Sequence, residues 1–256
     1  MKPPIITLLT DFGTQDTYVG AMKGVIQGIC PGARMVDLTH EVPAQAVIAG
    51  AFLLKTALDY LPKGTIHLAV VDPGVGSARK PVVLKAGGQT FVGPDNGLFT
   101  AALKGRKIAE IIELTGEKYR LKNPSSTFHG RDIFAPAAAY LAKGVPAARL
   151  GKKLSNLIWR EIPVPFKTPK GLVGQVLWID HFGNLVTNFE AHHLKKPLRL
   201  KIGKTVILDL HEHYAQAKKG ELIALIGSFG NLEISVNGGN AAQRLGATIG
   251  TTFLFF

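Results

Sequence analysis

The chain changes its hydrophobic pattern partway along, and this change limits the folds open to it more than any single residue does. In the first part, strand-like runs alternate with helix-like runs, at 5–9, 17–28, 35–38, 44–60 and 67–71. The same pattern continues with strand-like runs at 81–85 and 90–92 and a helix-like run at 133–142. Such alternation is typical of βαβ units. We therefore predict an α/β amino-terminal domain with a mostly parallel central sheet.

In the last third of the chain, helical periodicity nearly disappears. Short β-type runs follow one another at 172–179, 185–188, 198–202, 205–210, 222–226, 232–236 and 248–254. This pattern predicts a smaller all-β carboxy-terminal domain, folded as a barrel or a sandwich. Pro163, Pro165 and Pro169 lie in polar sequence before it, which is typical of an extended linker. The predicted divisions are 1–162 for the α/β domain, 163–170 for the linker and 171–256 for the β domain.

Composition indicates a globular protein of a reducing compartment. A chain of 256 residues that is 46% hydrophobic can bury a substantial core. Cys30 is the only cysteine, which excludes an intrachain disulfide and suits the cytoplasm. The sequence contains no apolar stretch of membrane-spanning length and begins without a signal-peptide pattern, so we expect a cytoplasmic protein without membrane contact. The net charge of +12 is spread over separated lysines, so we expect no specific nucleic-acid partner.

One polar motif follows directly on a short apolar run. Residues 67–71 predict a buried strand that stops at Asp72, in a Pro-Gly-Val-Gly turn, and Arg79 follows seven positions later. In parallel α/β sheets, ligands bind at the carboxyl ends of the strands. Because Pro73 restricts the turn and its glycines permit close backbone approach, the turn can fold Arg79 back toward Asp72. An acid and a base held in this way are a candidate catalytic pair.

A second acid occupies the corresponding place after the first strand-like run. Asp11 follows residues 5–9, so its carboxylate can share a crevice with Asp72 and accept hydrogen bonds from ribose hydroxyls. Alternatively, Asp11 caps the helix that begins near Thr17. The residues themselves leave both interpretations open.

The segment 125–132 contains a histidine whose role depends on its neighbours in space. His129 alone is most simply a hydrogen-bonded loop residue. Together with Asp72 and Arg79, it could bind a water molecule and stabilise the hydroxide form, because a nearby cation favours an anion. These three residues form our predicted catalytic set.

A further polar motif lies at 179–188, in the predicted β domain. The amide of Asn184 can both donate and accept hydrogen bonds, as the edge of an adenine or an amino acid requires, and Phe182 offers a ring face. The alternative is an Asp/Gly/Asn turn between two strands, and the spacing alone favours that alternative.

Together, five motifs resemble one enzyme family, the S-adenosylmethionine hydrolases or S-adenosylmethionine hydroxide adenosyltransferases, relatives of fluorinase and chlorinase. The motifs are Thr10-Asp11-Phe12-Gly13, Asp72-Pro-Gly-Val-Gly with Arg79, Gly93-Pro94-Asp95-Asn96-Gly97, His129-Gly130-Arg131-Asp132, and Asp180-His181-Phe182-Gly183-Asn184 with Thr187-Asn188. They occur in the family's order and with compatible spacing over nearly the whole chain. Their combination is far more specific than any one motif.

The resemblance implies an activity. The reaction is attack of water or hydroxide at ribose C5′ of S-adenosylmethionine, which releases adenosine and methionine, and the family's Asp-Arg-His triad corresponds to Asp72, Arg79 and His129. No cofactor and no metal are expected. The resemblance also implies a homotrimer whose sites combine the first domain of one subunit with the second domain of its neighbour.

The resemblance further implies a substrate-binding set. Asp11 would hold the ribose hydroxyls and Asn184 would contact the ligand, with Tyr18, Asp180 and Phe182 as further lining residues. The segment that in relatives receives the methionine end and the adenine corresponds to Ser228, Phe229, Glu233 and Val236. Halogenating relatives lack the triad and carry an extra loop that this chain lacks, so hydrolysis is favoured. The alternatives are a halogenase-like adenosyltransferase and a non-catalytic nucleoside or nucleic-acid binding module.

Overall fold

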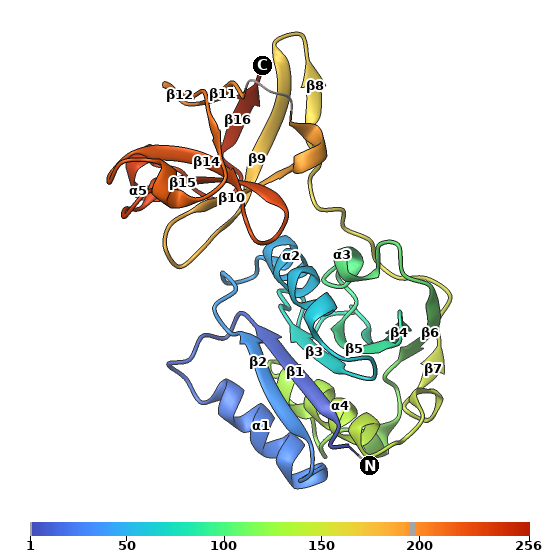
Figure 1. Cartoon of the computed structure of the whole chain (residues 1–256). Coiled ribbons are helices and arrows are strands. Elements are labelled where there is room, and N and C mark those ends of the chain that lie inside the picture. Colours follow the sequence, from blue (N-terminus) through green and yellow to red (C-terminus); the bar gives the residue numbers. More distant parts are fainter. Residues whose placement is uncertain (1, 195–197) are drawn as a thin grey trace. The chain divides into compact units, whose positions relative to one another are not determined.

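The computed structural model describes residues 2–194 and 198–256 and divides the chain into two compact units, with the division between Glu161 and Ile162 (Figure 1). We call them the first unit and the second unit. Strand β8 (Phe166–Thr168) lies inside the segment that was expected to be a linker, and it pairs with the strand that follows it.

A mixed seven-stranded sheet forms the centre of the first unit. Its strands are β1 (Ile5–Thr10), β2 (Arg34–Thr39), β3 (Ile66–Val70), β4 (Pro81–Ala86), β5 (Gln89–Pro94), β6 (Ile108–Glu113) and β7 (Lys152–Lys153), in the order β2-β1-β3-β5-β4-β6-β7. The β1–β2, β1–β3 and β3–β5 pairs are parallel, whereas the β4–β5, β4–β6 and β6–β7 pairs are antiparallel. The prediction of a mostly parallel sheet is therefore wrong. The cause is local: Gly87 and Gly88 both have positive φ and form a two-residue hairpin turn, which only antiparallel strands can share.

Helices cover both faces of this sheet. They are α1 (Tyr18–Ile29), α2 (Val47–Ala57), α3 (Thr100–Leu103) and α4 (Ala135–Ala142), with short 3₁₀ turns η1 (Leu58–Tyr60), η2 (Glu117–Tyr119) and η4 (Ala147–Arg149) and one π-helical turn η3 (Gly130–Phe134). Helices α1 and α4 pack together on one face, and α2 and α3 pack together on the other (Figure 1). The helix expected at 133–142 starts at Ala135, where Pro136 suits the first turn. The helix expected at 44–60 starts at Val47, and its last turn is 3₁₀.

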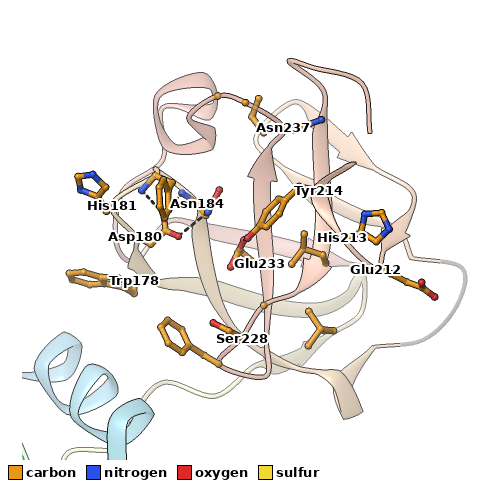
Figure 2. A pocket seen from close by; sticks show the side chains of 18 residues that line it. Trp178, Asp180, His181, Asn184, Glu212, His213, Tyr214, Ser228, Glu233 and Asn237 are labelled. Atoms are coloured by element: carbon orange, nitrogen blue, oxygen red, sulfur yellow. Dashed lines mark hydrogen bonds between the residues drawn. The ribbon is translucent and has the colours of Figure 1, made fainter. Parts of the chain in front are cut away.

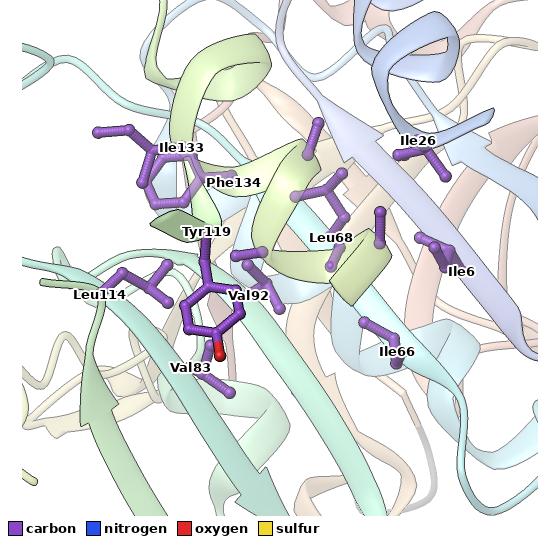
Figure 3. Close-up of a cluster of buried hydrophobic side chains, with 14 of the residues drawn as sticks. Ile6, Ile26, Ile66, Leu68, Val83, Val92, Leu114, Tyr119, Ile133 and Phe134 are labelled. Carbon is purple, nitrogen blue, oxygen red and sulfur yellow. The ribbon is translucent and has the colours of Figure 1, made fainter. Parts of the chain in front are cut away.

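The main core of the first unit lies between the sheet and the α1/α4 layer (Figure 3). Ile6 and Leu8 of β1 and Leu68 of β3 are fully buried there, facing Ile26 of α1. Burial of each such side chain contributes roughly 1.5–3 kcal/mol relative to exposure. This packing anchors β1 and β3 in the core, and Asp11 and Asp72 follow shortly after these two strands end.

The second unit is built almost entirely of β-strands. They are β8, β9 (Gly171–Ile179), β10 (Leu185–Glu190), β11 (Leu200–Ile202), β12 (Thr205–Ile207), β13 (Leu210–His211), β14 (Leu222–Ile226), β15 (Asn231–Val236) and β16 (Thr252–Phe255), accompanied by α5 (Ala241–Leu245), η5 (Ala191–His193) and η6 (Tyr214–Gln216). Apart from β8, the strands follow the path β12-β11-β16-β9-β10-β15-β14-β13. Because this is one continuous path, the expected barrel or sandwich stays a prediction. In the described parts of the chain, no helix has the length and apolarity that crossing a membrane requires.

Candidate active site

In the first unit, Asp72 and Arg79 form a nearly buried ion pair. Arg79 Nε donates to Asp72 Oδ1 at 2.9 Å, and Arg79 Nη2 donates to Asp72 Oδ2. The side chains of Arg79 and Asp72 are only 7% and 5% exposed. This two-pronged contact fixes the plane of the guanidinium group, which a single hydrogen bond would leave free to turn. The turn therefore folds Arg79 back onto the acid seven positions before it.

His129 lies against the same guanidinium group. Arg79 Nη2 is 2.6 Å from His129 Nδ1, and the Phe134 ring lies under the guanidinium at 5.2 Å. Burial, and next the Arg79 charge, lower the pKa of His129, although Asp72 and Asp132 act in the opposite direction. Since Nδ1 accepts from Arg79, we assign the proton of the neutral imidazole to Nε2. In this form His129 is a hydrogen-bond donor through Nε2.

One end of the guanidinium group is not used by the protein. Arg79 Nη1 is buried and has no hydrogen-bond partner among the described residues. A buried N–H group without a partner is costly, and such groups often mark a place where a ligand or water binds. The Arg79 cation therefore has donor capacity left for an anionic or strongly polar oxygen.

The loop that contains Ser126 packs tightly against the acid–base turn. A Cβ on Gly76 would lie 2.5 Å from the carbonyl oxygen of Ser126, and Gly76 has a φ of +76°. Only glycine satisfies both conditions without strain. This close contact brings the backbone that leads into His129 onto the turn that carries Arg79.

Asp11 lies at the same sheet edge as Asp72. It follows β1, whose Thr10 is paired with Val70 of β3, two residues before Asp72. Asp11 Oδ2 accepts the Gln45 backbone N–H at 2.8 Å. Burial is the main cause that raises the pKa of Asp11, and the negative charge of Asp72 adds to it. The bond that the Asp11 carboxylate accepts therefore comes from Gln45 and not from the start of α1, where the alternative prediction placed it as a helix cap.

Tyr18 belongs to an aromatic cluster beside His129. Its ring lies 5.0 Å from that of Phe128, which in turn lies 5.8 Å from that of Phe12. Tyr18 remains 47% exposed, as the first residue of α1. Tyr18 therefore packs against Phe128, the residue directly before His129, and part of the Tyr18 ring remains open to solvent.

The second unit contains a cavity of about 970 Å³ (Figure 2). All seven residues that were predicted for this part of the site line it: Asp180, Phe182, Asn184, Ser228, Phe229, Glu233 and Val236. They come from the β9–β10 turn, from the β14–β15 turn and from β15. Phe182 is 72% exposed, so it presents a ring face at this cavity. The volume suits a ligand of nucleoside size or larger.

Asp180 and Asn184 form one rigid unit at the wall of this cavity (Figure 2). Asp180 Oδ1 accepts the backbone N–H groups of Phe182 and Asn184 at 2.9 and 2.8 Å, and Oδ2 accepts Asn184 Nδ2 at 2.8 Å. The acid is therefore occupied by its own turn. Because this bond orients the Asn184 amide, its carbonyl oxygen can meet a donor of a ligand and its second N–H an acceptor.

Glu233 differs from Asp180, since in the described parts of the chain side chains donate to only one of its oxygens. Oε1 accepts Tyr214 Oη at 2.6 Å and Ser235 Oγ at 2.7 Å. A Cβ on Gly227 would lie 2.6 Å from Oε2, so only glycine leaves room for that oxygen. Burial, and next the hydrogen bond to Glu233, raise the pKa of Tyr214 well above its ordinary value. Tyr214 thus remains a protonated donor at any ordinary pH.

Sequence reasoning did not identify Tyr214. It lies in η6, 19 positions before its partner, and no local pattern marks it. The contact arises because the turn after β13 brings Tyr214 to Glu233 of β15. Tyr214 could have been identified only from a pattern that links residues distant in sequence, such as side-chain pairing across strands.

The chain matches two family profiles, described as the SAM hydroxide adenosyltransferase N-terminal domain at residues 6–151 and the SAM hydroxide adenosyltransferase C-terminal domain at residues 174–253. It is 42% identical to the (R)-S-adenosyl-L-methionine hydrolase of Salinispora tropica, with 96% of this chain and 95% of that protein covered. The protein of the same name from Thermus thermophilus is 39% identical, with 96% of each chain covered. A fluorinase from Actinoplanes sp. is 28% identical, with 97% of this chain and 96% of that protein covered.

A solved structure has the same fold. The crystal structure of an uncharacterized conserved protein from Thermotoga maritima superposes with a TM-score of 0.90 at 37% sequence identity. The superposition covers 98% of this chain and 100% of that one. The likeness therefore extends over both units.

Proposed function

The chain belongs to the family of S-adenosylmethionine hydroxide adenosyltransferases, and on that premise we propose that it hydrolyses S-adenosyl-L-methionine to adenosine and L-methionine. The observation that supports this activity most is the Arg79 guanidinium group, bound to Asp72 on one side and to His129 on the other. The names of four relatives at 37–42% identity agree with it.

In the proposed mechanism, Arg79 and His129 stabilise a hydroxide ion. The unpartnered Nη1 of Arg79 and the Nε2–H of His129 supply donors for its oxygen. A cation beside bound water favours its ionisation, and the proton that the water loses passes to the solvent. The oxygen lone pair forms a bond to C5′ of the ribose while the C5′–sulfur bond breaks, and the electron pair leaves with the sulfur of methionine. Because the sulfonium becomes a neutral thioether, the leaving group needs no proton.

Asp72 keeps the guanidinium group in one orientation for this attack. Alignment of a nucleophile with a reacting carbon can contribute roughly 7–11 kcal/mol to catalysis. A bidentate, nearly buried carboxylate is suited to that task. Asp11, whose side chain lies at the same sheet edge, is proposed to accept the ribose hydroxyls and so to hold C5′ in line.

The residues of the second unit are proposed to bind the rest of the substrate. Asn184, oriented by Asp180, would meet a donor of the adenine or of the amino acid. Glu233 would add a negative charge for a substrate that carries a positive sulfur, while Phe182 supplies an aromatic face. Local carboxylates are needed for this because the protein as a whole is strongly basic.

We further propose a cytoplasmic homotrimer in which the first unit of one subunit and the second unit of a neighbour complete each site. The residues predicted for one site are divided between the two units, which agrees with this arrangement. Sedimentation velocity measures the assembly directly, and a monomer at working concentration would contradict it.

The activity can be tested in ¹⁸O-labelled water. Purified protein incubated with S-adenosylmethionine is expected to release methionine and adenosine with the label in the 5′ oxygen, as measured by mass spectrometry. Both epimers at sulfur are tested separately, and the R epimer is expected to react faster, since the relatives are named for it. Addition of chloride separates hydrolysis from halogenation: a halogenated nucleoside in place of adenosine would refute the proposal.

Variants of the triad test the mechanism in the same assay. Asp72→Ala and Arg79→Ala are each expected to lower turnover at least about a thousandfold, which corresponds to roughly 4 kcal/mol of barrier. Arg106→Ala is the matched control, because Arg106 also pairs with an aspartate, Asp59, whose side chain is 86% exposed. This control is expected to retain turnover. Near-normal rates in both triad variants would remove the assignment.

A further inference from the structure

The bonds inside the turn that carries Asp72 and Arg79 join its residues to one another. Its internal contacts are the Arg79–Asp72 ion pair, the Arg79 N–H to Ser77 Oγ at 3.2 Å, the Val75 N–H to the Asp72 carbonyl at 3.2 Å, and two bonds from Ser77 to the Gly74 carbonyl, at 3.1 Å from the N–H and 2.6 Å from Oγ. None of these bonds ties the two ends of the turn to the sheet. The register between β3 and β5 ends at Leu68–Val92, three residues before the end of the apolar run at Val71. Something else must hold the turn if Arg79 is to keep its position.

The Gly93-Pro94-Asp95-Asn96-Gly97 motif supplies contacts to both ends. Asn96 Nδ2 donates to the Val71 carbonyl at 2.8 Å, directly before Asp72. The Asp95 N–H donates to the Lys80 carbonyl at 2.9 Å, directly after Arg79. Two adjacent residues thus hold the chain on either side of the catalytic turn.

This motif is itself firmly fixed. Asn96 Oδ1 accepts the Leu98 N–H at 3.1 Å, so the amide cannot rotate without losing a bond at each end. Asp95 is buried, and its Oδ1 accepts the Ile158 N–H at 2.8 Å. A Cβ on Gly93 would lie 2.1 Å from the Ala69 carbonyl oxygen, so glycine allows β5 to pass close to the end of β3. The position of Asn96 against Val71 is therefore determined by the backbone.

We propose that Asn96 is a positioning residue for the reaction, which with the Asp95 backbone clamps the ends of the Asp72–Arg79 turn and so sets the place of Arg79 against His129. The inference rests on the proposed function for its catalytic meaning. Asn96 acts through the turn, since its amide reaches the carbonyl that precedes Asp72. A displacement of about 1 Å at a reacting group can lower a rate by about a hundredfold.

Two substitutions at this position test the clamp. Asn96→Ala removes the amide, and Asn96→Asp keeps its shape and the acceptor for Leu98 but cannot donate to Val71. Both are expected to lower kcat at least about tenfold while KM changes less than about threefold, because the groups proposed to bind the substrate remain. If either variant fails to fold, the other still gives the measurement.

Gln89→Ala is the matched control. Gln89 starts the same strand β5, at its opposite end, and its Nε2 donates to the Leu58 carbonyl at 3.1 Å. The Gln89→Ala substitution removes the same kind of side-chain amide bond from the same unit. Its fall in melting temperature is therefore expected to be similar to that of Asn96→Ala, but without loss of kcat. Asn96 variants that keep kcat within about twofold, or a Gln89 variant that loses as much kcat, would overturn the proposal.

A second readout does not depend on turnover. The pKa of the His129 imidazole, measured by NMR and assigned by comparison with His129→Gln, is expected to lie below its ordinary value in the parent, because of burial and Arg79. In Asn96→Ala it should move back toward that value, as Arg79 shifts relative to Asp72, His129 and Asp132. An unchanged titration overturns the clamp. If the unsubstituted protein makes no adenosine, the proposed function is refuted instead. The His129 titration then still tests whether Asn96 holds the turn.

Discussion

At the scale of single residues, the site depends on which atoms of each charged group are already occupied. Both oxygens of Asp72 bind Arg79, and both oxygens of Asp180 bind its own turn. Glu233 differs from these two acids, because Tyr214 and Ser235 both donate to the same oxygen, Oε1. Residue type alone shows that a carboxylate is present, whereas these contacts show which carboxylate can still meet a ligand.

Tyr214→Phe is expected to weaken substrate binding and to leave the chemistry unchanged. Loss of the bond to Glu233 Oε1 lets the carboxylate turn away from the cavity, and a hydrogen bond to a charged group contributes about 1.5–3 kcal/mol. We expect KM to rise at least about fivefold with kcat unchanged within about twofold, in steady-state assays. Tyr60→Phe, on an 83% exposed tyrosine, is the control and should match the parent. A fall in kcat at unchanged KM would contradict this role for Tyr214.

At the scale of elements, strand order determines which sequence motifs meet. Strands β1 and β3 are adjacent and parallel, so the residues that follow them, Asp11 and Asp72, emerge at one edge. The hairpin between β4 and β5 then returns the chain so that Asn96 reaches the same edge. Periodicity predicted most of these strands, but it could not give their order, because pairing depends on contacts between distant segments.

The same strands enclose a histidine that should make stability depend on pH. His67 of β3 is fully buried, its Nδ1 lies 2.8 Å from Thr7 Oγ1, and its ring stacks on Phe91 of β5 at 5.0 Å. Burial, and next the Arg106 charge, lower its pKa to about 4, while Gln89 acts in the opposite direction. The unfolded chain therefore binds a proton more readily than the folded one, so this contribution to stability is complete above pH 6.5 and is lost as the pH falls toward 4.

Urea titrations at pH 7.5 and pH 5.0 can measure this effect. The parent is expected to lose about 2 kcal/mol more stability than His67→Gln between the two conditions, from the difference between pH 5.0 and the ordinary histidine pKa. Other titrating groups are common to both proteins and cancel in the comparison. An equal pH dependence in parent and variant would show that His67 is not responsible.

At the scale of the whole molecule, the polar site residues are divided between two units that each have their own core. The first unit holds the Asp72, Arg79 and His129 cluster, and the second holds the cavity lined by Asn184 and Glu233. If each site is shared between subunits, as proposed, the residues of the first unit are inactive without those of a neighbour's second unit, and the reverse also holds.

Mixing two inactive variants tests this sharing. Asp72→Ala carries a defective first unit and Asn184→Ala a defective second unit, so each homotrimer should be inactive or weak. After the subunits are exchanged by mild denaturation and refolding, mixed trimers should recover a measurable part of the parent's turnover, because some sites combine two intact halves. A mixture of Asp72→Ala with Arg79→Ala is the control and should recover nothing. Equal activity of both mixtures would contradict a shared site.

The sequence by itself determined the change from an α/β pattern in the first part of the chain to a β pattern in the last part, most strand positions and the residue types of the site. It did so because side-chain periodicity and turn chemistry are local properties. Only the tertiary structure decided that Arg79 turns back to bind Asp72 and reach His129, that the first sheet is mixed, and that Tyr214 meets Glu233. Each of these depends on groups brought together across many residues, where packing and hydrogen-bond geometry, rather than local pattern, determine the partner.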